Sequence, residues 1–91
     1  MADPDNNHFV IEATWDDEAE VWVAESDEVP GLITEADSRA HLIEKLTVLI
    51  PELLELNHHP FDPNKEIDLV VRFRRKAANE HEEYIRLPKA A

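Results

Sequence analysis

An amphipathic stretch in the middle of the chain limits the possible folds more than any other feature. Between residues 42 and 54, leucine and isoleucine recur at helical spacing, and charged side chains occupy the opposite side. Asp37 and Ser38 precede this stretch and are suitable N-cap residues for a helix. Because Pro51 interrupts the stretch, we expect either a kinked helix or two abutting helices. In either form, the apolar side must pack against another element.

Four segments around this helix alternate between apolar and polar residues, which is typical of strands with one buried face. They are residues 9–15, 21–25, 32–35 and 67–74. The polar residues between the first two segments include no glycine or asparagine, so we expect a loop longer than a two-residue turn there. Before the third segment, Pro30 and Gly31 fit the two central positions of a type II turn.

This order of elements predicts an α/β (α+β) fold of the type βββαβ. The first three strands form an antiparallel meander, and the helix returns the chain so that the fourth strand lies parallel to the first. Residues 76–87 have features of both helix and strand, and we favour a fifth strand. The helix covers one face of the sheet, so Val10, Trp22 or Val70 would be half-exposed on the other. A homodimer would cover that open face.

The length of 91 residues leaves room for one domain. We assign residues 1–7 to a disordered lead, residues 8–75 to the domain, and residues 76–91 to a C-terminal extension. The chain has no cysteine, and its first residues do not resemble a secretory signal. No apolar run is long enough to span a membrane. We therefore expect a soluble, cytoplasmic protein without a membrane partner.

The formal net charge is −12, and it is unevenly distributed. Residues 1–64 hold sixteen acidic and two basic residues, whereas residues 65–91 hold five acidic and seven basic residues. A nucleic-acid partner normally requires a basic surface, so the charge argues against direct binding of DNA or RNA. An acidic surface favours the approach of a basic protein, although the charge could also serve solubility alone.

Residues 22–26, 29–36 and Ser38, followed by a long helix containing residues 50–54, resemble the HicB-like antitoxin superfamily. They resemble more closely a stand-alone branch that is described as a domain of unknown function. The resemblance implies a partial ribonuclease-H-like fold without nuclease activity. It also implies a partner, a small basic messenger-RNA-cleaving toxin of the HicA type. Many members carry a C-terminal DNA-binding module, but too few residues follow the fourth strand here for such a module.

Two groups of residues have ligand types suited to a metal ion. The first group falls in one hairpin: Asp16, Asp17, Glu18 and Glu20. The second group lies in the loop after the helix: His58, His59 and Asp62. Neighbouring side chains on one turn mostly point apart, so we favour a solvated turn and an exposed loop. No serine is arranged with a histidine as a nucleophile, and we predict no enzyme activity, no cofactor and no metal site.

One basic cluster lies near the end of the fourth strand segment: Arg72, Arg74, Arg75 and Lys76. We favour protection of a sheet edge or balance of the acidic front half over contact with nucleic acid. The aromatic residues Trp15 and Trp22 fit a core or a dimer face better than a partner-binding hot spot.

Acidic residues also flank the predicted turn at Pro30 and Gly31, and they are our first choice for contact with a basic protein. The predicted partner-binding residues are Trp22, Glu25, Asp27, Glu28 and Glu35. The sequence therefore predicts a non-catalytic, antitoxin-like module that binds a small basic ribonuclease toxin or a related protein. The alternative is an orphan domain that associates only with itself and has a structural or regulatory role.

Overall fold

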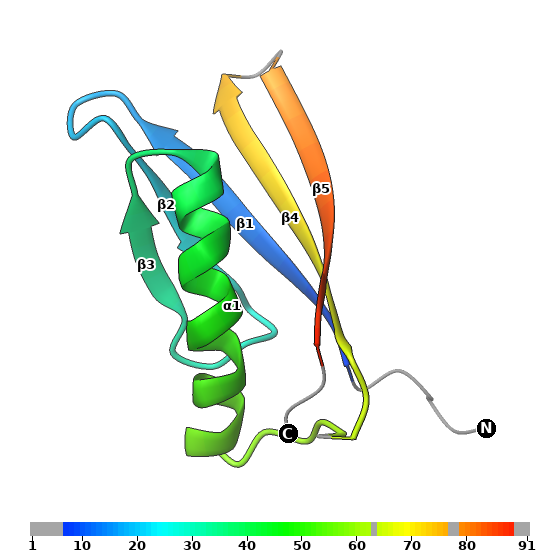
Figure 1. Ribbon diagram of the computed structural model, residues 1–91. Coiled ribbons are helices and arrows are strands. Elements are labelled where there is room, and N and C mark those ends of the chain that lie inside the picture. Colours follow the sequence, from blue (N-terminus) through cyan, green and yellow to red (C-terminus); the bar gives the residue numbers. More distant parts are fainter. Residues whose placement is uncertain (1–6, 63, 77–78, 89–91) are drawn as a thin grey trace.

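The computed structural model describes residues 7–62, 64–76 and 79–88 (Figure 1). These residues form one sheet with a single helix against it. The elements are β1 (His8–Asp16), β2 (Val21–Glu25), β3 (Ile33–Ala36), α1 (Arg39–Leu56), β4 (Ile67–Lys76) and β5 (Asn79–Leu87). The strands lie in the order β3-β2-β1-β4-β5. The predicted mixed fold of type βββαβ is confirmed, with a fifth strand added at its end.

The strand pairings follow the predicted topology. β2 pairs antiparallel with both β1 and β3, and β4 pairs parallel with β1. β5 pairs antiparallel with β4 along nearly its whole length, so the strand prediction for this segment is confirmed. The strands that follow one another along the chain are neighbours, except that α1 carries the chain from the edge strand β3 back to the centre.

The helix begins and ends with side-chain caps. Ser38 is the N-cap, and its hydroxyl accepts a hydrogen bond from the backbone N–H of His41 at 3.1 Å. At the other end, the side chain of Asn57 donates to the carbonyl of Leu53 at 2.9 Å. The helix continues through Pro51 as one element, so the expected alternative of two separate helices is wrong. Within the described residues, no helix has the length and apolarity needed to cross a membrane.

The core lies between α1 and the sheet face that α1 covers. Four helix residues one turn apart are completely buried: Leu42, Leu46, Ile50 and Leu54. The facing strand residues include Phe9, Ile11, Ala13, Leu69, Val71 and Phe73. These residues alternate along β1 and β4, as the strand periodicity predicts. The turn before β3 is closed by a hydrogen bond from Leu32 N–H to the carbonyl of Val29, with Gly31 at φ +80°.

Two residues expected on the open face are buried. Trp22 is only 9% exposed, because the β1–β2 register places it opposite Trp15 on the face that the helix covers. Val70 does lie on the open face, but it is only 7% exposed between Val10 and Tyr84 of the neighbouring strands. The expectation that Trp22 and Val70 are half-exposed is therefore wrong. Val10 is partly buried, as expected.

Asn7 was assigned to the disordered lead, and the structure corrects this. Its side chain is 5% exposed and donates to the carbonyls of Asp62 at 2.8 Å and Glu66 at 3.1 Å. Its amide oxygen accepts from the backbone N–H of Asp62 at 2.8 Å. Asn7 thus fastens the start of β1 to the loop before β4. Residues 1–6 and 89–91, parts of the predicted lead and extension, lie outside the described residues.

Candidate functional site

The sheet face opposite α1 carries rows of charged side chains, because the register aligns the outward residues of neighbouring strands. In one row, Glu25, Glu12 and Arg72 are successive partners across β2, β1 and β4. Glu82 of β5 continues the same row. This open face divides into a half with paired charges, over β1, β4 and β5, and a half over β2 and β3 whose carboxylates are unpaired among the described residues.

In the paired half, arginine side chains are held by carboxylates. Arg72 lies between Glu82 at 3.0 Å and Glu12 at 3.5 Å. Arg74 forms an ion pair with Glu80 at 3.3 Å. These pairs are exposed to solvent, so each contributes at most about 1 kcal/mol to stability. They neutralise Arg72 and Arg74, two of the four residues of the predicted basic cluster.

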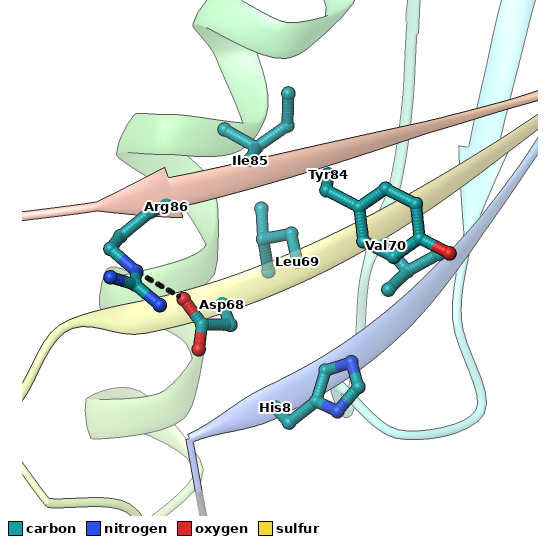
Figure 2. A pocket seen from close by; sticks show the side chains of 7 residues that line it. All are labelled: His8, Asp68, Leu69, Val70, Tyr84, Ile85 and Arg86. Carbon is teal, nitrogen blue, oxygen red and sulfur yellow. Dashed lines mark hydrogen bonds and ion pairs between the residues drawn. The ribbon is translucent and has the colours of Figure 1, made fainter.

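The same pairing continues toward the other end of β5. Arg86 donates to Asp68 at 2.8 Å (Figure 2). It also lies 3.6 Å from Glu66. The hydrogen bond with Asp68, together with the attraction of both carboxylates, raises the pKa of the Arg86 guanidinium above its ordinary value. Arg75, another member of the basic cluster, lies over the ring of Trp15 with its Cζ atom 4.9 Å from the ring centroid.

In the unpaired half, three predicted partner-binding carboxylates are exposed near the end of β2. The carboxylates of Glu25, Asp27 and Glu35 form no hydrogen bond or ion pair with any residue that the structure describes. Ile33 is 73% exposed and is the register partner of Glu25, so it lies beside these carboxylates on the same face. We call Glu25, Asp27, Glu35 and Ile33 the acidic patch.

The acidic patch borders a shallow hollow of about 290 Å³. Its lining residues are Glu12, Glu25, Ser26 and Asp27. Glu12 and Glu25 are direct partners in the antiparallel register, where two like charges disfavour pairing. Arg72 relieves the charge of Glu12 from the side of β4, but no cation of the described residues reaches Glu25. A cationic group from another molecule would relieve this repulsion.

Two further predicted contact residues have roles within the chain. Glu28 accepts a hydrogen bond from the backbone N–H of Val10 at 2.7 Å, and Ser26 donates to the carbonyl of Val10 at 2.7 Å. These side chains replace a strand partner where β2 no longer lies beside β1. The carboxylate of Glu28 is therefore occupied, and Trp22 is buried in the core. Neither the Glu28 interaction nor the role of Asn7 has a sequence signal, because both depend on loops that tertiary structure brings together.

The acidic hairpin between β1 and β2 uses its carboxylates to stabilise the turn. Asp16 accepts hydrogen bonds from the backbone N–H groups of Glu18 at 3.0 Å and Ala19 at 3.2 Å. Asp17 accepts from the indole N–H of Trp15 at 2.8 Å. These carboxylates follow the turn and do not converge on one point.

The histidines after the helix are also separated. His58 is exposed at φ +53°, and the ring of His59 packs against Phe9 with centroids 5.9 Å apart. Asp62 accepts a hydrogen bond from the backbone N–H of Asn64. Across the described ranges, no group of three or more histidine, cysteine, aspartate or glutamate side chains is arranged to hold a metal ion.

Comparison with known proteins identifies a family for this chain. Residues 8–79 match the model of a family described as a domain of unknown function, DUF1902. The chain belongs to the DUF1902 family. The match extends from the start of β1 to the start of β5, a slightly longer range than the predicted domain of residues 8–75.

Among solved structures, this DUF1902 chain is similar to a hypothetical protein from the extremely thermophilic bacterium Thermus thermophilus. The two share 43% sequence identity with a TM-score of 0.62, and the similarity covers 76% of this chain and 92% of the other. No curated protein matches the chain.

The DUF1902 sheet also carries an apolar band between its charged rows. Val10, Val70 and Tyr84 are successive register partners on the open face, and Tyr84 is 75% exposed. A hollow of about 550 Å³ lies beside this band (Figure 2). Its lining residues are His8, Asp68, Leu69, Val70, Tyr84, Ile85 and Arg86. The hollow is thus bordered by the exposed ring of Tyr84 and by Asp68 and Arg86, which already pair with each other.

Proposed function

We propose that this DUF1902 domain is a non-catalytic protein-binding module, and that its acidic patch binds a small basic protein. The observation that carries this proposal is that the side-chain carboxylates of Glu25, Asp27 and Glu35 have no ion-pair partner among the described residues, while the described arginines of the same face are paired with carboxylates. The resemblance to HicB-like antitoxins indicates the class of partner, a basic ribonuclease toxin or a protein descended from one.

The acidic patch has the chemistry that a basic partner requires. Free carboxylates accept two parallel hydrogen bonds from an arginine side chain, and this geometry adds specificity to the charge attraction. Ile33 supplies apolar surface beside them, which a partner can bury without removing a charge from water. The formal charge of −12 also accelerates the encounter with a cationic protein at low salt.

Co-expression with any small basic protein encoded by an adjacent gene tests this proposal. We expect the two proteins to co-purify, and the double variant Glu25→Lys/Glu35→Lys to weaken binding by about tenfold or more, which corresponds to about 1.4 kcal/mol. The control is Glu18→Lys/Glu55→Lys, which changes the net charge equally at exposed positions outside the acidic patch. Equal loss of binding in both variants would contradict a role for the acidic patch. If no basic partner is found, the proposal that the partner is a toxin or a related protein fails.

A second candidate function, self-association, is favoured by the apolar band of Val10, Val70 and Tyr84. An exposed tyrosine ring on the edge strand of an uncovered sheet face is suited to contact with a second copy of the chain. Sedimentation equilibrium tests this role: a homodimer that Tyr84→Lys converts to a monomer would support it. A chain that stays monomeric at every accessible concentration would rule it out.

A further inference from the structure

The sheet face that α1 covers continues beyond the first turn of the helix. β4 and β5 extend past the start of α1, so the final part of this face has no helix above it (Figure 1). Here four strands contribute one aromatic side chain each: Trp15, Trp22, Phe73 and His81. Trp22 contacts Trp15 and Phe73 edge-on, with centroids 5.3 Å and 5.1 Å apart. This aromatic floor lines a hollow of about 600 Å³.

Two arginines from different elements border the same hollow. The Cζ atom of Arg39, in the first turn of α1, lies 5.8 Å from the centroid of Phe73. The Cζ atom of Arg75, near the end of β4, lies 4.9 Å from the centroid of Trp15. Neither guanidinium has a carboxylate partner among the described residues, whereas the other three arginines form ion pairs. The net charge of the chain is −12, yet both arginines that lack a described carboxylate partner border the same hollow.

The acidic side chains at the rim are already engaged. Asp37 lies 3.2 Å from Nδ1 of His41, and Glu80 forms an ion pair with Arg74 at 3.3 Å. They do not reach the guanidinium groups of Arg39 and Arg75. The Cζ atoms of both groups lie over aromatic rings, and no described carboxylate occupies their N–H groups, which can therefore donate to an anion.

We propose that this hollow binds a small anion in which a phosphate or carboxylate is attached to a flat ring. The N–H groups of Arg39 and Arg75 would hold the anionic group, because a guanidinium matches both anions with paired hydrogen bonds. The ring would stack against the accessible aromatic side chains Trp15 and His81. The volume of about 600 Å³ is typical of small-molecule sites.

The overall charge restricts the ligand to a small one. An extended polyanion such as single-stranded RNA would meet the repulsion of the acidic chain over many phosphates, whereas a single anionic group meets only the two arginines. The site uses no residue of the acidic patch. It is therefore independent of the proposed binding of a basic protein, and either proposal stands if the other fails.

Tryptophan fluorescence offers a direct test, because the chain has two tryptophans and both line the hollow. The probes are adenosine monophosphate and benzoate, and their uncharged counterparts are adenosine and benzyl alcohol. Excitation at the red edge of indole absorption avoids absorption by adenine. We expect saturable quenching by at least one anionic probe, and binding of its uncharged counterpart weaker by about tenfold or more. Comparison of the two anions distinguishes a phosphate from a carboxylate ligand.

Substitutions locate the binding. Arg39→Gln and Arg75→Gln should each weaken binding of the anionic probe by about tenfold. The control Arg86→Gln also removes one positive charge, but it lies outside the hollow and should leave binding unchanged. Thermal unfolding and near-UV circular dichroism of each variant confirm that the fold is retained. Three results would overturn the proposal: no saturable quenching by either anion, equal binding of the uncharged counterparts, or equal weakening by Arg86→Gln.

Discussion

At the scale of single residues, Asn7 shows how one buried polar side chain can replace regular structure. Its amide joins the start of β1 to a loop more than fifty positions away, by donating to the carbonyl of Asp62 and accepting from the N–H of the same residue. The loop before β4 has no strand partner of its own at this point. Buried backbone groups need partners, and Asn7 supplies several of them at once.

Substitution of Asn7 should destabilise the fold substantially. We expect Asn7→Ala to lower the free energy of unfolding by about 1–3 kcal/mol, because it leaves partly buried loop carbonyls without donors. Asn7→Asp should cost more, since a carboxylate oxygen would then face the carbonyl of Asp62. Urea denaturation measures both changes. The control is Asn64→Ala, at an exposed position, with an expected change within about 0.5 kcal/mol. A loss of similar size in the control would show that the whole loop, and not the Asn7 side chain, determines stability.

At the scale of elements, α1 holds the fold together through one ridge of side chains. Leu42, Leu46, Ile50 and Leu54 are completely buried, while the flanking residues Ile43, Leu49 and Leu53 are partly buried against the same core. Burial of each large apolar side chain contributes roughly 1.5–3 kcal/mol. The contribution of this ridge outweighs the unfavourable effect of Pro51, which is why the helix continues through a residue that lacks a backbone donor.

Truncation within this ridge should be far more damaging than truncation beside it. Leu46→Ala should lower the free energy of unfolding by about 2–5 kcal/mol, because it leaves a cavity between α1 and the sheet. The matched control is Val48→Ala on the same helix, at a side chain that is 60% exposed, where we expect a change within about 0.5 kcal/mol. Chemical denaturation compares the two. Equal losses would mean that the helix is stabilised mainly by its own propensity and not by packing.

Most elements could be predicted from the sequence because each has its own periodicity. The ridge of α1 repeats every three or four residues, and the strands alternate every second residue. The position of Trp22 could not be predicted in this way. Alternation shows that Trp22 and Ala24 share a face, but only the register with β1 shows which face it is.

The candidate site was predictable only in part, for a similar reason. Glu25, Asp27 and Glu35 are near one another along the chain, and the short connection between β2 and β3 keeps them together. Glu28 was separated from them by its bond to Val10, an interaction between residues eighteen positions apart. The hollow at Arg39 and Arg75 lies between the start of α1 and the end of β4, and no local sequence pattern predicts that these two elements are close in space.

At the scale of the whole molecule, the net charge of −12 opposes the compact state. The repulsion is strongest around the acidic hairpin and the acidic patch, where carboxylates of the described residues lack cationic partners. The exposed ion pairs of β4 and β5 oppose this effect only weakly, because solvent screens the attraction between exposed charges.

Added salt should therefore stabilise this protein. Raising sodium chloride from about 0.01 M to about 1 M shortens the screening length from about 30 Å to about 3 Å and suppresses the repulsion between carboxylates. We expect the melting temperature to rise by several degrees in differential scanning calorimetry. Glu25→Gln/Glu35→Gln should reduce this rise, because it removes part of the repulsion beforehand. A melting temperature that falls with salt would mean that the surface ion pairs dominate instead.

The position of β1 has a consequence for how the chain is made. This strand is the first of the five strands to be synthesised, yet it lies in the middle of the sheet between β2 and β4. One edge of β1 stays unpaired until α1 and the following loop have been synthesised, because its partner β4 comes after them. During that interval the nascent meander exposes the backbone groups that β4 will later pair with. The order of synthesis thus delays completion of the centre of this sheet until α1 and β4 have been made.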